Sequence, residues 1–71
     1  MDTPTPSQII AARHAAGHTQ TVAAHTVFAA LRTWQDWEAG KYKMPPERWL
    51  LYLILTRQIS ISSAIRLVSD R

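Results

Sequence analysis

The sequence predicts an all-α protein, a compact domain of five helices, and three observations support this. Apolar residues recur at helical spacing, helix-capping residues stand at the expected boundaries, and residues 19–40 have the pattern of two short helices joined by a tight turn. The chain has 71 residues, enough for one small domain. We therefore expect residues 1–71 to form a single domain with a flexible leader at 1–5.

The first helix is expected over residues 6–16. Thr5 has the character of an N-cap, Pro6 suits the first helical position, and Gln8 completes a capping box. Gly17 follows, where a left-handed residue ends many helices. Both ends of this helix are thus predicted by local signals.

The next two helices are expected close together in the chain. Thr19 caps a helix from 20 to about 27, residues 28–30 form a turn, and a third helix runs from about 31 to 39 and ends at Gly40. Two short helices joined by a tight turn are the layout of a helix-turn-helix DNA-binding unit.

A fourth helix is expected from Pro46 to about residue 57, and Ser60 can cap a fifth. Residues 49–55 are apolar on every side, so the fourth helix must be buried on more than one face. One face covers the core, and the other is expected to meet a second copy of the chain. The predicted dimer seam, within residues 46–71, consists of Leu51, Leu55, Ile61, Ile65 and Val68.

Composition narrows the classes of function. The formal net charge of +3 favours an anionic partner. The absence of cysteine excludes disulfides and thiolate metal sites, and the three histidines lack metal-ligand spacing. No signal peptide is recognisable, and the longest apolar run is too short to span a bilayer. We expect a cytoplasmic protein without a metal, a cofactor or a membrane contact.

An enzyme is not expected. Gly17 and Gly40 are the only glycines, so there is no glycine-rich phosphate loop. Ser60, Ser62 and Ser63 suit helix caps and helix surface rather than nucleophiles. We identify no catalytic residue, and a domain of this size leaves little room for a substrate or effector pocket.

One segment carries a specific resemblance. Residues 32–40 read RTWQDWEAG and are followed by KYKMPP, while Thr19, Gln20 and Ala24 match in the preceding helix. With these residues the chain resembles the Cro/repressor-type helix-turn-helix family, also called the xenobiotic-response-element family, in its phage and mobile-element subgroup. The resemblance covers roughly residues 6–57 and implies a lambda-repressor-like fold and a regulator that binds double-stranded DNA.

The resemblance also implies roles for individual residues. Arg13 and Glu38 match a structural ion pair that ties the first helix to the third. The residues that would face base edges in the major groove are Leu31, Arg32 and Asp36. The residues that would contact phosphates are Gln20, Thr33, Lys41 and Lys43.

The chemistry of the expected third helix leaves alternatives open. The Arg32 guanidinium can donate two hydrogen bonds to guanine or simply contact a phosphate. Asp36 can accept from cytosine or pair with Arg32 one helical turn earlier, and the pairing is preferred. Leu31 can touch a thymine methyl or lie at the rim of the groove. Arg48 and Arg57 are expected to be exposed helix charges.

Three positions depart from the family pattern. Phe28 stands where the turn usually has glycine, so a different backbone conformation is expected there. Ala30 replaces the usual Ser or Thr cap, a loss of about 1 kcal/mol. His18 replaces an apolar residue.

Trp34, Trp37 and Trp49 are expected in the core rather than on a platform that stacks single-stranded bases.

The favoured function is a dimeric repressor on a short inverted repeat. Two-fold symmetry would place the two recognition helices in successive major grooves, about 34–36 Å apart. One alternative is a protein-interaction module, such as an antitoxin or phage regulator, that uses the apolar C-terminal surface. The other is an architectural DNA binder without sequence preference, whose affinity would fall steeply with salt.

Overall fold

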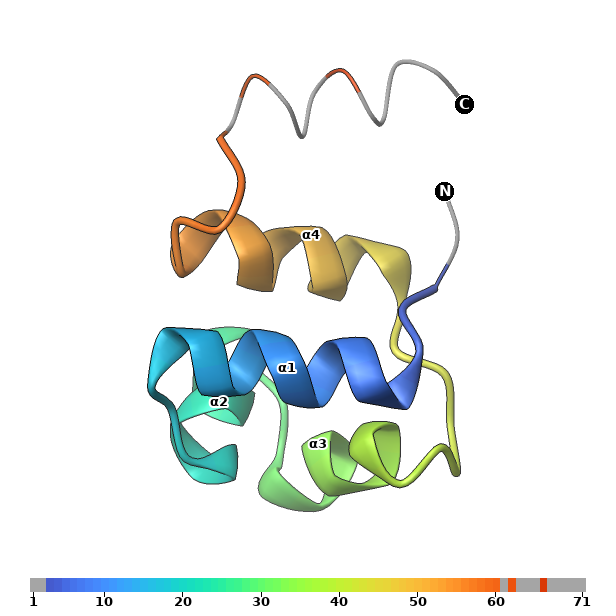
Figure 1. Cartoon of the computed structure of the whole chain (residues 1–71). Coiled ribbons are helices and arrows are strands. Elements are labelled where there is room, and N and C mark those ends of the chain that lie inside the picture. The colour runs from blue at the N-terminus through green and yellow to red at the C-terminus, as the bar shows by residue number, and fades with distance from the viewer. Residues whose placement is uncertain (1–2, 61, 63–65, 67–71) are drawn as a thin grey trace.

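The computed structural model describes residues 3–60, Ser62 and Arg66. This part of the chain contains four helices and no strand, so the all-α prediction is confirmed (Figure 1). The helices are α1 (Pro6–Ala16), α2 (Gln20–Thr26), α3 (Leu31–Glu38) and α4 (Pro46–Leu55). Helices α2 and α3 end one residue earlier than expected and α4 ends two residues earlier.

The fifth helix was expected after Ser60. Its apolar stripe of Ile61, Ile65 and Val68 lies outside the described residues. At the other end of the chain, part of the expected leader is described. Pro4 is buried, and Thr5 caps α1. These two residues therefore belong to the packed domain.

Local capping explains where α1 and α2 begin and end. The Thr5 hydroxyl accepts from the Gln8 amide at 3.2 Å, and the Gln8 side chain accepts from the Thr5 amide at 2.8 Å, which completes the predicted capping box. Gly17 takes the left-handed conformation at the end of α1, with φ of 70°. The Thr19 hydroxyl accepts from the Val22 amide at 3.2 Å and starts α2.

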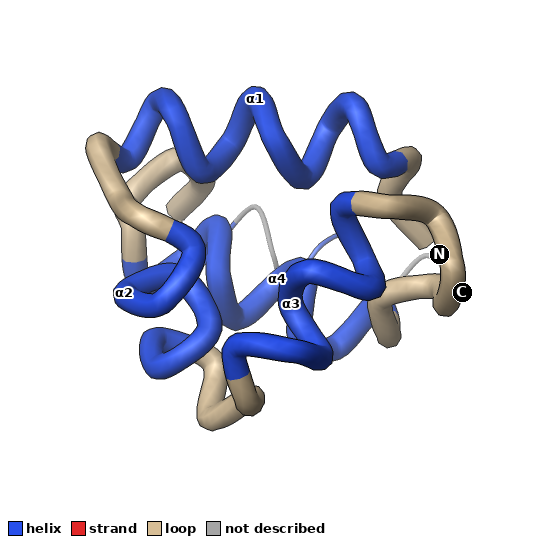
Figure 2. The backbone as a smooth tube through the Cα atoms, turned by 90° about the horizontal axis from the view of Figure 1, so that it is seen from below, coloured by secondary structure: helices blue, strands red, loops and turns tan. Residues whose placement is uncertain are grey.

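The four helices enclose one core. Helix α2 packs against α3 and α4, and α1 packs against α3. In Figure 1, α4 runs along one side of the molecule while α2 and α3 occupy the opposite side. In Figure 2, which looks from below, α1 runs along one edge and α4 lies behind α2 and α3. The second and third helices are thus held from two directions by the rest of the chain.

Trp34 is at the centre of this core. It is fully buried, and its ring centroid lies 5.0 Å from that of Tyr52 in α4 and 5.8 Å from that of Trp37. Trp37 is also buried, and Trp49 is partly buried against the same cluster. Trp34 and Trp37 are therefore core residues, as predicted, and Trp49 packs at the edge of the same core.

Candidate nucleic-acid interface

The turn between α2 and α3 is closed by main-chain hydrogen bonds. The Phe28 amide donates to the His25 carbonyl at 3.1 Å, and the Ala29 amide donates to the Ala24 carbonyl at 2.9 Å. Phe28 has φ of 59°, which is the left-handed conformation that glycine adopts without strain. The expectation of a different conformation here was wrong. Phe28 takes the left-handed conformation despite its bulky side chain and bears a strain of about 1–2 kcal/mol.

Helix α3 then begins without a side-chain cap. Ala30 occupies the N-cap position in extended conformation and offers no side-chain acceptor. Trp34 and Trp37 anchor the inner side of the helix in the core. Their spacing leaves the opposite side of α3 in contact with solvent.

The outer side of α3, defined here as Leu31, Arg32, Thr33 and Asp36, presents the residues expected to meet DNA. Leu31 is 39% exposed, and the Arg32 side chain is 76% exposed. Thr33 is exposed as well, whereas the Asp36 side chain is 17% exposed. The four residues therefore offer one long cation, one apolar group, one hydroxyl and one carboxylate on a short helix.

Arg32 and Asp36 are paired along the helix. The Arg32 Nε lies 3.4 Å from Asp36 Oδ1, one helical turn apart. Of the two roles considered for Asp36, pairing with Arg32 is the one present in the structure. Because the pair is exposed, its direct contribution to stability is small. It does restrict where the Arg32 guanidinium can point.

Arg13 and Glu38 join α1 to α3. The Arg13 Nε donates to Glu38 Oε2 at 2.6 Å, and Nη2 donates to Oε1 at 3.3 Å. The same carboxylate accepts from Trp34 Nε1 at 2.6 Å and from Gln20 Nε2 at 3.0 Å. Four donor groups from three helices therefore converge on one carboxylate. This network sets the orientation of α2 and α3 relative to α1.

The network also changes the acidity of Glu38. Burial by itself raises the pKa of this carboxyl group. The hydrogen bonds from Arg13, Gln20 and Trp34, together with the positive charge of Arg13, outweigh burial and hold the pKa below its ordinary value of 4.5. Glu38 is thus ionised at neutral pH, as the ion pair requires.

Gln20 has a structural role that sequence reasoning missed. Its amide nitrogen donates to Glu38, and its amide oxygen accepts from the Gln35 side chain at 3.3 Å. Since a side-chain amide carries two N–H groups, one donor is left for another acceptor. A phosphate contact by Gln20 remains a prediction, and it would use that second donor.

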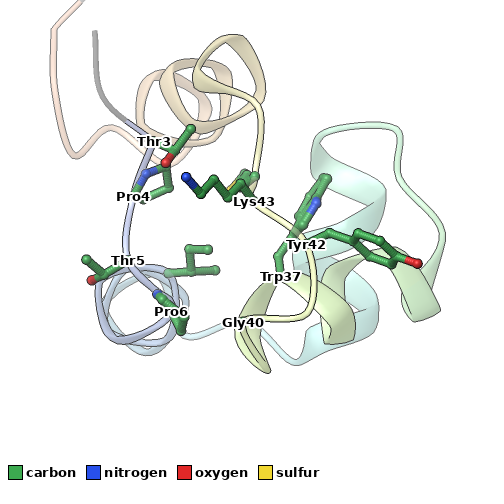
Figure 3. A pocket seen from close by; sticks show the side chains of 10 residues that line it. Thr3, Pro4, Thr5, Pro6, Trp37, Gly40, Tyr42 and Lys43 are labelled. Carbon is green, nitrogen blue, oxygen red and sulfur yellow. The ribbon is translucent and has the colours of Figure 1, made fainter.

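The loop between α3 and α4 carries the basic residues. Lys41 and Lys43 are both exposed, and the Lys41 ammonium lies 5.7 Å from the centroid of the Tyr42 ring. The loop borders a cavity of about 270 Å³ that is also lined by residues 3–6 and Trp37 (Figure 3). The titratable side chains in that lining are Tyr42 and Lys43.

The predicted dimer seam is described in part. Leu51 is partly buried, and Leu55 is 51% exposed at the end of α4. The remaining members, Ile61, Ile65 and Val68, lie outside the described residues.

Within the described part of the chain, no three acidic, histidine or cysteine side chains are grouped to hold a metal ion. Nor does that part contain a helix long and apolar enough to cross a membrane.

Two further contacts were not expected from the sequence. Arg48 is exposed, as predicted, and its guanidinium also donates to the Val27 carbonyl, 21 positions away. His18 places Nδ1 2.9 Å from the Tyr52 hydroxyl and packs edge-on to that ring. Burial raises the pKa of Tyr52, so the hydroxyl keeps its proton at neutral pH.

The two contacts differ in how far they could be predicted from the sequence. A histidine was unexpected at position 18, but this did not identify Tyr52 as its partner. Nothing in the sequence pointed to the bond from Arg48, because a main-chain carbonyl carries no sequence signal.

The sequence matches no protein-family model and no curated protein.

Proposed function

We propose that this protein is a sequence-specific regulator that binds double-stranded DNA, with α2 and α3 acting as a helix-turn-helix. The observation that carries the proposal is the two-sided character of α3. Trp34 and Trp37 fix its inner side in the core, while Leu31, Arg32 and Thr33 project into solvent. A helix held in this way is rigid enough to position side chains against base edges.

The dimensions and charges agree with this role. An α-helix with its side chains is about 10–12 Å wide, and the major groove of DNA is about 12 Å wide. In the proposed complex α3 enters the groove, where Leu31, Arg32 and Asp36 face bases and Thr33 faces the backbone. Lys41 and Lys43 follow α3 and are exposed, so they can approach phosphates beside the groove. Gln20 contacts a phosphate with its second amide hydrogen.

The active form is proposed to be a dimeric repressor in the cytoplasm. One copy presents a single short recognition helix, which contacts few base pairs. A two-fold dimer reads an inverted repeat with two such helices, about 34–36 Å apart. Exposed Leu55, at the C-terminal end of α4, supports a seam on that side of the chain. Repression then follows from occupancy of the operator, with no small-molecule effector.

The test is selection of binding sites from a random duplex library at about 150 mM salt, where non-specific attraction is weakened. The expected result is enrichment of an inverted repeat. Arg32→Gln is expected to lose the preference at one base pair, with discrimination reduced by about 1–3 kcal/mol. The matched control is Arg57→Gln, which removes the same charge from an exposed site after α4. Equal site profiles for both variants would contradict the proposed role of Arg32.

A protein-interaction module is the second candidate. It is favoured by the exposed apolar side chains Val22 and Leu55, which are 47% and 51% exposed. It predicts that the library yields no enriched site and that Arg32→Gln leaves function intact. Retention of DNA without a shared motif would instead indicate an architectural binder, whose affinity falls steeply with salt.

A further inference from the structure

The side chain of Phe28 packs little against the rest of the described structure, although its backbone helps to close the turn. It adopts φ of 59°, a conformation strained for a bulky side chain, and it is 82% exposed. That exposed fraction is the largest among the large apolar side chains that the structure describes. Such strain persists mainly at functional sites, and the Phe28 side chain gains little packing from the described residues in return.

The backbone around Phe28 is held on both sides. Main-chain hydrogen bonds from Phe28 and Ala29 close the turn onto the end of α2, and Arg48 binds the Val27 carbonyl directly before it. Two residues after Phe28 comes Ala30, the N-cap of α3. In Figure 2 this turn is the loop segment at the lower edge of the view, between α2 and α3. The ring therefore projects from a fixed backbone next to Leu31 and Arg32 in the sequence.

The chemistry of the ring restricts its target. A phenyl group has no hydrogen-bond donor or acceptor, so it recognises apolar surface. In the major groove the apolar group that differs between bases is the 5-methyl group of thymine, and phenylalanine is among the side chains that contact it. We propose that Phe28 contacts a thymine methyl group beside the bases that α3 reads. This proposal rests on the proposed function, because it assumes that α3 lies in the major groove.

The experiment removes each half of this contact separately. Phe28→Gly deletes the ring and tolerates the left-handed backbone, so the thermal midpoint of the free protein is expected to hold or rise. On the DNA side, each thymine of the selected operator is replaced by deoxyuridine, which removes only the methyl group. Phe28→Asn is the second variant, since asparagine also tolerates this conformation.

Without the Phe28 ring, the affinity for the operator is expected to stop depending on the thymine methyl group. Wild-type protein should lose about tenfold in affinity at one deoxyuridine position, the factor that corresponds to about 1.4 kcal/mol. Phe28→Gly should bind the thymine operator about tenfold more weakly and be indifferent to deoxyuridine at that position. Deoxyuridine at other thymines should affect both proteins equally.

Two results overturn the proposal in different ways. If wild type and Phe28→Gly bind the operator equally and share one deoxyuridine profile, DNA binding stands, and the exposed ring serves a protein partner instead. If wild type enriches no sequence at all, the proposed function fails, and the role of Phe28 fails with it.

Discussion

The guanidinium of Arg48 in α4 donates a hydrogen bond to the main-chain carbonyl of Val27, the residue directly before the left-handed turn. Val27 itself is fully buried. A carbonyl in that position needs a partner, because an unpaired buried acceptor destabilises a fold. Arg48 therefore links α4 to the turn that precedes and orients α3.

Arg48→Met is expected to destabilise the protein by about 1–3 kcal/mol, the usual effect of leaving a buried acceptor unpaired. Urea unfolding followed by tryptophan fluorescence measures this change. Arg57→Met is the control, since Arg57 is exposed and the same charge is lost. An equal midpoint for the two variants would show that the Val27 carbonyl does not depend on Arg48.

Glu38→Gln tests the carboxylate that joins three helices. Removal of its charge leaves Arg13 partly buried without a counter-ion, with 16% of its side chain exposed. The expected loss is about 3 kcal/mol, at the lower end for breaking a buried ion pair. Glu47→Gln, at an exposed position in the first turn of α4, is the matched control and should change stability by less than about 1 kcal/mol. Similar unfolding midpoints would mean that the network contributes little.

The pH dependence of stability follows from the same group. The pKa of Glu38 is lower in the folded protein than its ordinary value of 4.5, so the folded state holds its proton less tightly than the unfolded state does. The associated stability is present above pH 4.5 and is lost as the pH falls through the folded-state pKa. Thermal unfolding between neutral and acidic pH measures the loss. Glu38→Gln should flatten the curve in this range, and a wild-type slope in that variant would assign the effect to other groups.

Asp36→Asn tests whether the Arg32–Asp36 pair shapes recognition. The substitution removes a negative charge from the surface that approaches the negatively charged DNA in the proposed complex, so affinity for random DNA is expected to rise. Discrimination at the base pair read by Arg32 is expected to fall, because the guanidinium is no longer held at 3.4 Å from a carboxylate. Binding to operator and scrambled duplexes across a salt series measures both effects. Glu47→Gln is again the control, and a matching rise there would indicate a general charge effect.

Much of the helical layout could be predicted because its causes are local. Thr5 and Gln8 cap α1 through contacts within three residues of each other, and Gly17 ends it with its own backbone conformation. The core positions of Trp34 and Trp37 followed from their spacing on one helix. Such signals lie within one or two helical turns, so the chain order reveals them.

Contacts between distant segments could not be predicted in the same way. The backbone at Phe28 was expected to differ from that of glycine, yet the hydrogen bonds of the turn and the bond from Arg48 to Val27 accompany a left-handed conformation there. Gln20 was expected to contact a phosphate, and its hydrogen bond to Glu38, 18 positions away, was not expected. These outcomes depend on which elements pack together.

The sequence by itself determined where α1, α2 and α3 begin and which side of α3 is apolar, because these features depend on neighbouring residues. It also determined the net positive charge of the chain, which depends only on composition. Only the tertiary structure decided that four donor groups meet on Glu38, that His18 pairs with Tyr52, and that Phe28 is presented to solvent from a fixed turn. The physical reason is that these features arise where helices meet, so they depend on how segments far apart in the chain pack together around Trp34.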